Sequence, residues 1–316
     1  MLRDKDMVSV IISCNTNPDL DGFACAFAYQ ELLSKLGQEV EMAILGAPHD
    51  EVKYLLNRFS IVFPQNASGG PNQASKIILV DTSDLRGLDK SIIPENVVEV
   101  IDHRKINDQH LFPNAKIQIE LVGACVTLIA EKYRKQGIKL SRESAVLIYG
   151  AIISNTLNFK ANTTTERDRA VASWLAENFD LPKNLAEEMF LAKSDFAGKK
   201  FQQKIRGDFA WFEFAGQRVG IAQIEMIGGR DLIEQRYDEI SSELVELKAE
   251  LFLDFVFLSI VELKEEVNFF AAVDKKTQKM LADIFNLEFV SGQAIRSGLI
   301  MRKEITPLIK EYLENN

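Results

Sequence analysis

Short runs of apolar, mostly β-branched residues alternate with amphipathic segments in the N-terminal part of the chain, and this alternation constrains the fold most strongly. Continuous apolar strands that are separated by helices are typical of a parallel sheet with both faces covered. The pattern predicts strands at residues 8–14, 40–45, 76–80 and 97–101, and helices at 23–36, 50–59, 125–136, 142–156 and 166–178. The last of these helices is expected to open with a capping box formed by Thr163 and Glu166.

The pattern weakens around residues 180–200, where we place a domain junction. A chain of 316 residues is long enough for about two domains, each with its own core. We therefore predict an α/β fold with a mostly parallel N-terminal domain, residues 1–192, and a smaller α/β domain, residues 193–316. The smaller domain should contain a hairpin at 209–214 and 219–224, helices at 230–248, 275–285 and 304–314, and strands at 252–260 and 267–273.

Composition excludes some classes of partner. The chain has 46 acidic and 37 basic residues and a formal charge of −9, which argues against a broad basic face for nucleic acid. It does not exclude a small anionic substrate, because bound divalent cations can invert the local field. No apolar run reaches the roughly 18 residues of a membrane span, and no targeting segment is visible. The three cysteines, Cys14, Cys25 and Cys125, lie in apolar runs without C-x-x-C spacing, so we expect free core thiols in a cytoplasmic protein without a membrane partner.

Acidic residues follow three of the predicted strands. Asp19 and Asp21 come after the first strand, Asp81 and Asp84 after 76–80, and Asp102 with His103 after 97–101. Because the carboxyl ends of parallel strands share one edge of a sheet, these side chains should gather there. A single aspartate could simply cap a helix, but clustered carboxylates are destabilising unless a cation compensates them. Oxygen ligands with one imidazole suit Mg²⁺ or Mn²⁺, and two such ions suit phosphoryl hydrolysis. The other histidines, His49 and His110, are expected at the surface.

The order of these motifs resembles the DHH phosphoesterase superfamily. The resemblance rests on Asn15-Thr-Asn-Pro-Asp19-Leu-Asp21, Val80-Asp-Thr-Ser-Asp84 and Ile101-Asp-His103. Three further segments are similar to manganese-dependent (family II) inorganic pyrophosphatases: Val122-Gly-Ala, 150–165 and 298–307. Asn15 and the Asp-His-Arg sequence that ends in Arg104 are also similar to the prune and yeast-type exopolyphosphatase branch.

The resemblance implies a site for two divalent cations, Mn²⁺ or Mg²⁺, at the domain interface. It makes Asp81 the bridging ligand, places Asn15 and Asp19 on the first ion, and places Asp21, His103 and Asn155 on the second. Asp102 would orient His103 or a water molecule, and Arg302 and Lys303 would bind the substrate phosphates. Asn15 and Asn155 stand where pyrophosphatases have histidine and aspartate, and a family lysine falls on Ala210. Because amides replace stronger ligands, we expect metal preference to shift from Mn²⁺ towards Mg²⁺.

The implied activity is hydrolysis of a phosphoanhydride, with pyrophosphate or a short polyphosphate as the small anionic substrate. Arg104 cannot donate a proton as an imidazole can, so we expect it to clamp phosphate oxygens and leave proton transfer to Asp102 or a water molecule. The other interpretation of Arg104 is an ion pair with neighbouring acids. Two other functions stay open: a nucleotide phosphoesterase, or a degenerate homologue that binds or regulates. A homodimer also stays open as the assembly.

Overall fold

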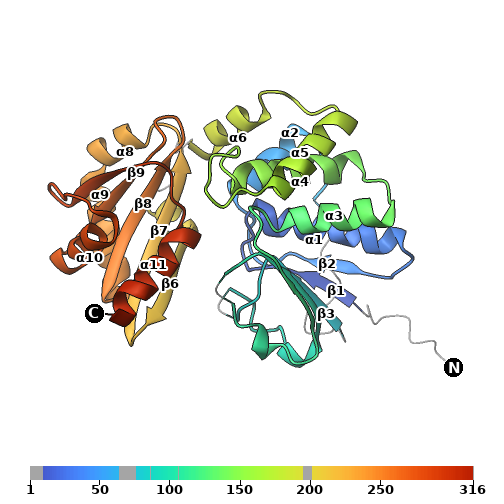
Figure 1. Cartoon of the computed structure of the whole chain (residues 1–316), viewed down its shortest axis with the longest axis horizontal. Helices are drawn as coiled ribbons and strands as arrows, with labels where there is room; N and C mark the ends of the chain where they lie inside the picture. The colour runs from blue at the N-terminus through green and yellow to red at the C-terminus, as the bar shows by residue number, and fades with distance from the viewer. Residues whose placement is uncertain (1–9, 64–75, 86, 106, 195–200, 316) are drawn as a thin grey trace. The chain divides into compact units, whose positions relative to one another are not determined.

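The computed structural model describes residues 10–63, 76–85, 87–105, 107–194 and 201–315. The chain forms two compact units, Met1–Met189 and Phe190–Asn316 (Figure 1). Residues 195–200, at the end of the segment where the sequence pattern weakens, lie outside the described residues. Each unit has its own sheet, and the α/β class is confirmed for both.

The first unit contains a five-stranded sheet of order β2-β1-β3-β4-β5, in which all the neighbouring strands are parallel. Its strands are β1 (Val10–Ser13), β2 (Glu41–Ala43), β3 (Lys76–Val80), β4 (Val97–Asp102) and β5 (Lys116–Ile119). Its α-helices are α1 (Leu20–Lys35), α2 (Asp50–Arg58), α3 (Val126–Gln136), α4 (Arg142–Asn155) and α5 (Glu166–Asn178). Two short 3-10 helices, η2 (Pro94–Asn96) and η3 (Gln109–Leu111), flank β4. The predicted parallel sheet is therefore confirmed, with β5 as an additional edge strand.

One predicted cap is wrong. Helix α5 begins at Glu166, and its capping box is formed by Thr165 and Asp168 rather than by Thr163 and Glu166. The Thr165 side chain accepts from the Asp168 amide, and the Asp168 carboxylate accepts from the Thr165 amide. The residue at the cap is Thr165, and the residue three positions later, whose carboxylate can reach back to the cap amide, is therefore Asp168 and not Glu166.

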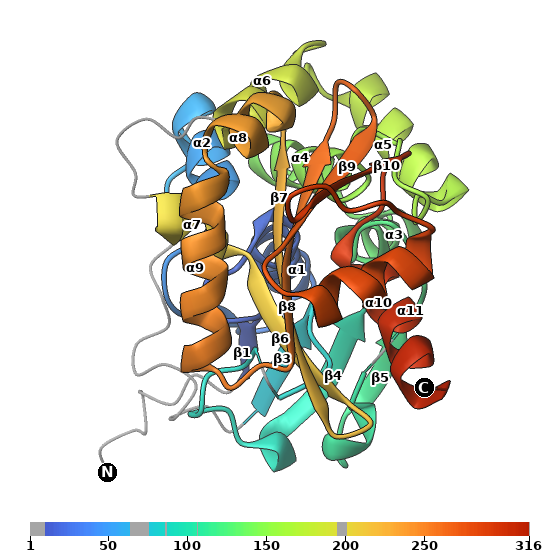
Figure 2. The same ribbon diagram turned by 90° about the vertical axis from the view of Figure 1, so that its left-hand side faces the viewer.

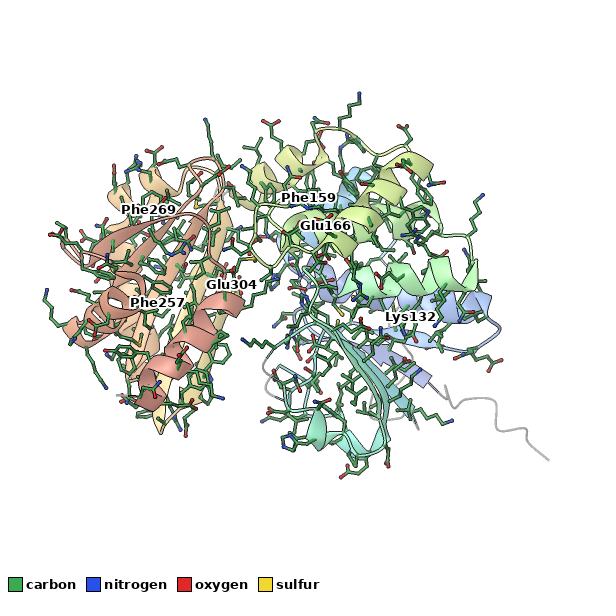
Figure 3. All side chains as sticks on the ribbon, in the orientation of Figure 1. Lys132, Phe159, Glu166, Phe257, Phe269 and Glu304 are labelled. Atoms are coloured by element: carbon green, nitrogen blue, oxygen red, sulfur yellow. The ribbon has the colours of Figure 1, made fainter. Side chains whose placement is uncertain are left out.

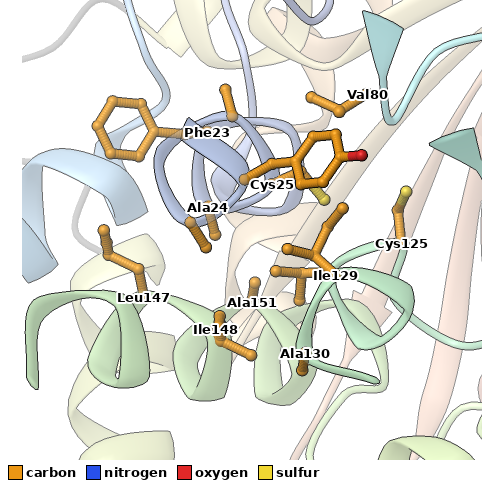
Figure 4. Close-up of a cluster of buried hydrophobic side chains, with 14 of the residues drawn as sticks. Phe23, Ala24, Cys25, Val80, Cys125, Ile129, Ala130, Leu147, Ile148 and Ala151 are labelled. Carbon is orange, nitrogen blue, oxygen red and sulfur yellow. The ribbon is translucent and has the colours of Figure 1, made fainter. Parts of the chain in front are cut away.

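Helices α1, α3 and α4 pack their apolar faces together over the sheet. Figure 4 shows Cys25 and Cys125 in this cluster beside Val80 and Ile129. All three cysteines, Cys14 included, are buried and free in the part of the chain that the structure describes, as the sequence predicts. Burial is the largest cause that raises the pKa of Cys125 to about 12, which keeps this thiol protonated and unreactive at neutral pH.

The second unit contains a five-stranded mixed sheet of order β10-β9-β8-β7-β6, parallel only between β7 and β8. Its strands are β6 (Phe209–Phe214), β7 (Gln217–Met226), β8 (Phe255–Glu262), β9 (Val267–Ala272) and β10 (Gln293–Ser297). Its helices are α6 (Leu185–Ser194), which starts at the end of the first unit, α7 (Phe201–Gly207), α8 (Gly229–Gln235), α9 (Tyr237–Glu250), α10 (Lys275–Phe285) and α11 (Arg302–Asn315). The predicted hairpin is confirmed as β6 and β7, whereas the single helix expected at 230–248 is two helices that meet at Arg236.

Helices cover both faces of this second sheet. One core cluster joins α7, α8 and α9 to one face, and another joins α10 and α11 to the other (Figure 2). Phe269 belongs to the first cluster and Phe257 to the second, and both side chains are buried on the strands (Figure 3). Within the described ranges, no helix is both long enough and apolar enough to cross a membrane.

Candidate metal centre

The ends of β1 and β3 bring two carboxylates together across the first helix turn. Asp19 caps α1, and its Oδ1 accepts from the Gly22 amide at 3.0 Å. A Cβ placed on Gly22 would lie 3.6 Å from Asp19 Oδ1 and 3.4 Å from Asp81 Oδ2. Gly22 therefore lies beside both acids, which places Asp19 and Asp81 near each other, as expected for the carboxyl edge of a parallel sheet.

Asp81 carries the signs of a strained, unsatisfied group. Its φ of 56° lies in the left-handed region, which glycine adopts freely and aspartate only occasionally. Its side chain is buried, and among the residues that the structure describes Oδ1 has no hydrogen-bond partner. Burial, followed by the charges of Asp21 and Asp19, raises the pKa of Asp81 well above its usual range. Strain of this kind at a buried acid points to a functional site.

His103 faces these acids through one ring nitrogen. The Val122 carbonyl can only accept, so it takes the Nδ1–H of His103 at 2.9 Å. This contact turns Nε2 towards Asp81 Oδ1 at 3.4 Å and Asp21 Oδ2 at 3.9 Å. Ligand atoms of Asp21, Asp81 and His103 all lie within 4.8 Å of one another. A histidine that donates one ring N–H to a carbonyl and points the other nitrogen at carboxylates has the usual arrangement of a metal ligand.

Asp21 differs from Asp81 because the protein already satisfies it. Its Oδ2 accepts from the Cys125 amide at 2.7 Å, and its Oδ1 accepts from the Val126 amide at 2.9 Å. These amides lie at the start of α3, where the helix dipole favours an anion. The Asn155 side chain donates to Asp21 Oδ2 from Nδ2 at 2.5 Å. The structure thus places Asn155 beside Asp21 as the sequence predicts, with its N–H towards the acid; its expected role as an ion ligand stays a prediction.

Asp102 and Arg104 link the ends of β3 and β4. Asp102 is fully buried, and its oxygens accept from the His103 amide and from the Ser83 hydroxyl. The guanidinium of Arg104 donates to the Asp81 carbonyl at 2.8 Å and lies 3.6 Å from Asp84 and 3.8 Å from Asp102. Burial opposes its charge, but the charges of Asp102, Asp81 and Asp84 outweigh burial and raise the pKa of Arg104. One positive charge therefore lies at the margin of the acid group.

The remaining predicted site residues have different surroundings. The amide oxygen of Asn15 is buried against Gly87 and has no hydrogen-bond partner within the described residues. In the second unit, Arg302 donates from its guanidinium to the Asp208 carbonyl at 2.7 Å and also pairs with the Asp208 carboxylate. Lys303 follows on α11 and is half-buried. Ala210 pairs with Ile221 in the β6–β7 hairpin. His49 precedes α2 and is half-buried, whereas His110 is exposed.

Sequence reasoning missed the groups that hold these side chains. The Val122 carbonyl, the amides at the start of α3 and the carboxylate of Asp208 carry no residue pattern of their own. The segment Val122-Gly-Ala was noticed for its resemblance, and it proves to supply the hydrogen-bond acceptor for His103. The sequence signal for this loop is a glycine next to an apolar residue, Val122-Gly123, just before the predicted helix at 125–136.

Comparisons with known proteins show which family the chain resembles. A model described as "DHH family, N-terminal domain" matches residues 9–152, and one described as "DHHA2 domain" matches residues 187–312. The manganese-dependent inorganic pyrophosphatase of Bacillus subtilis is 30% identical over 312 residues, which cover 97% of this chain and 99% of that protein. The chain belongs to the family of manganese-dependent inorganic pyrophosphatases.

Two further relatives match nearly the whole length of this chain. A probable manganese-dependent inorganic pyrophosphatase of Bacillus velezensis is 30% identical, with coverage of 97% of this chain and 99% of that protein. The crystal structure of a putative family II inorganic pyrophosphatase from Methanococcus jannaschii matches with a TM-score of 0.82 and 27% identity, and covers 96% of this chain and 99% of that chain.

The donor atoms of the described residues suit Mn²⁺, the ion for which the family is named. Asp81 Oδ1 is a buried acceptor without a hydrogen-bond partner in the part of the chain that the structure describes, and His103 Nε2, just after β4, lies 3.4 Å from it. Carboxylate oxygens with one imidazole form a donor set that Mn²⁺ and Mg²⁺ accept, and a cation there would relieve the repulsion that raises the pKa of Asp81.

Proposed function

We propose that the chain hydrolyses the phosphoanhydride bond of inorganic pyrophosphate or a short polyphosphate, with two divalent ions, Mn²⁺ or Mg²⁺, as cofactors. The observation that carries this proposal is the convergence of ligand atoms of Asp21, Asp81 and His103 within 4.8 Å, where Asp81 Oδ1 has no hydrogen-bond partner among the residues that the structure describes. The name of the Bacillus subtilis relative supports the choice of pyrophosphate.

In this proposal the ions are held by four side chains, Asp19, Asp21, Asp81 and His103. The amide oxygen of Asn15, which has no hydrogen-bond partner among the described residues, is a further ligand. When bound, divalent ions polarise phosphate oxygens and lower the pKa of water at the site. Val122 fixes the tautomer of His103, so that its Nε2 stays aimed at the acids. Asp102 acts as a positioning residue, because both of its oxygens are engaged by the His103 amide and the Ser83 hydroxyl.

Three cationic side chains are assigned to the substrate. Arg104 stands beside Asp81, and part of its planar guanidinium can bind phosphate oxygens while one N–H stays on the Asp81 carbonyl. Arg302 and Lys303 are proposed to bind the remaining phosphate oxygens, and Asp208 fixes the plane of the Arg302 guanidinium beforehand. Fixed cations of this kind stabilise charge that develops on the leaving phosphate.

The test is phosphate release by the purified full chain. Pyrophosphate, tripolyphosphate, longer polyphosphates and nucleotides are compared, each with Mn²⁺ and with Mg²⁺. We expect pyrophosphate or tripolyphosphate to be the best substrate. The variant Asp81→Asn should lose roughly a hundredfold or more in kcat, because the site then lacks one charge where the ions bind.

The matched control is Asp180→Asn, which removes an exposed carboxylate of the same unit. It should keep the activity of the parent chain. If phosphate is released faster from nucleotides than from pyrophosphate or tripolyphosphate, the substrate class is nucleotides instead. An equal rate for Asp81→Asn and the parent would overturn the proposed site.

A further inference from the structure

Asp21 and Asp81 lie close to the same imidazole but differ in what surrounds them. Asp81 Oδ1 has no hydrogen-bond partner among the described residues, whereas Asp21 accepts from two main-chain amides and from Asn155. An ion that approaches Asp81 finds an empty acceptor. An ion that approaches Asp21 must compete with groups that already stabilise the carboxylate.

The competition centres on one oxygen. The Asp21 oxygen that pairs with the imidazole is Oδ2, which lies 3.9 Å from His103 Nε2. The same oxygen accepts from the Cys125 amide at 2.7 Å and from Asn155 Nδ2 at 2.5 Å. A carboxylate oxygen has two lone pairs in its plane, and both are therefore taken. The amide of Asn155 must face Asp21 with its nitrogen, because its oxygen would be repelled at this distance.

We propose that the Asn155 amide competes with a divalent ion for Asp21, so that the chain binds one divalent ion tightly and a second one roughly ten- to a hundredfold more weakly. The factor corresponds to the loss of one charge-assisted hydrogen bond when the second ion binds. This inference rests on the proposed function for the identity of the ions, and it assigns Asn155 as a positioning residue that sets metal stoichiometry.

Calorimetric titration of the metal-stripped full chain with Mn²⁺ tests the proposal. The parent chain should show one tight and one weaker binding step. Asn155→Asp removes the competing donor and adds a ligand, so the second step should tighten at least about tenfold. Asn155→Ala removes the donor without adding charge, and its second step should also be tighter than that of the parent.

An unchanged or a weaker second step in Asn155→Ala overturns the proposal. If the amide oxygen of Asn155 were itself an ion ligand, this variant would bind Mn²⁺ more weakly than the parent does. Two equally tight steps in the parent would overturn it as well. The matched control is Asn158→Asp, which places the same new charge on an exposed residue shortly after α4 and should leave both steps unchanged.

Thermal unfolding gives a second readout that does not depend on calorimetry. In chelator, Asn155→Asp should unfold at a lower temperature than the parent, because two carboxylates then face each other without a cation. Mn²⁺ should raise its unfolding temperature by more than it raises that of the parent; an equal rise would contradict the proposal. Both readouts are independent of hydrolysis, so an inactive chain with this binding pattern would refute the proposed function and leave this inference standing.

Discussion

At the scale of single residues, the site combines a satisfied acid with an unsatisfied one. Asp21 rests on the amides that open α3, whereas Asp81 has a left-handed backbone and an oxygen without a partner within the described residues. The sequence predicts that both acids lie at the sheet edge, because strand ends can be read from apolar runs. It cannot predict which of their oxygens are occupied, because main-chain donors leave no residue pattern.

Arg104 is the residue whose role is most open to a direct test. Arg104→Lys keeps the positive charge but loses the planar fork that can hold both the Asp81 carbonyl and a phosphate. We expect KM for pyrophosphate to rise about tenfold, with a smaller change in kcat. Steady-state phosphate release measures both constants.

The neighbouring Lys105 supplies the control for Arg104. Its side chain is exposed, so Lys105→Ala should leave KM within about twofold of the parent. An unchanged KM in Arg104→Lys would mean that the guanidinium serves as an ion-pair partner of Asp84 and Asp102, the other interpretation of its sequence position.

At the scale of elements, Asp168 connects α5 to the loop that orients His103. Its buried carboxylate accepts from the amides of Gly123 and Ala124, from the Thr127 hydroxyl, and from the amide and hydroxyl of Thr165. Burial opposes ionisation, but these hydrogen bonds prevail and lower the pKa of Asp168. The start of α5 therefore fixes the segment that follows Val122.

Asp168→Asn tests this connection through pH. The amide can accept with only one oxygen, so several buried donors lose their partner, and we expect the free energy of unfolding to fall by about 3 kcal/mol at pH 7. A group whose folded pKa is lowered stabilises the protein above its unfolded pKa and loses that effect as pH falls through the folded pKa. The difference between parent and variant should therefore shrink below about pH 4.

Denaturant titrations at several pH values measure this difference. Asp180→Asn removes an exposed carboxylate and should stay within about 0.5 kcal/mol of the parent at each pH. A gap between parent and Asp168→Asn that stays constant down to pH 2 would show that a cavity or a shape change, rather than the charge of Asp168, causes the loss.

Element boundaries could be predicted where the apolar pattern is continuous. Strand β3 and helices α5 and α10 span the predicted residues, because each has clear periodicity and a polar start. Strands β5 and β10 were not expected, since each is short, lies at a sheet edge and has largely half-buried or exposed side chains. Without a buried face, such a strand has little period-2 pattern.

At the scale of the whole molecule, the chain is two cores joined in sequence. The first unit packs its apolar residues around α1, α3 and α4, and the second packs helices on both faces of its mixed sheet. All the proposed ion ligands lie in the first unit, whereas Arg302 and Lys303 lie in the second. Ion binding should therefore stabilise the core of the first unit directly.

The two tryptophans of the chain allow this to be measured. Trp174 lies on α5 of the first unit and Trp211 on β6 of the second, so Trp211→Phe and Trp174→Phe each leave one reporter. A saturating ligand that binds only the native state adds about 2.7 kcal/mol at a hundred times its dissociation constant. Mn²⁺ should raise the fluorescence unfolding midpoint reported by Trp174 by more than the midpoint reported by Trp211.

Sodium chloride at the same ionic strength serves as the reference in that experiment. Equal shifts at both tryptophans would mean that the units unfold together, and a shift confined to Trp211 would place ion binding outside the proposed residues.

The backbone of Asp81 has one more consequence. Glycine would adopt the positive φ of Asp81 at a lower cost, so an aspartate there lowers the stability of the ion-free chain at the residue proposed to bind the ion. Proteins that bind a ligand only when native survive longer in its presence, since unfolded copies are degraded. Cellular abundance of this protein should therefore follow the supply of its ion, which couples the amount of catalyst to the nutrient it needs.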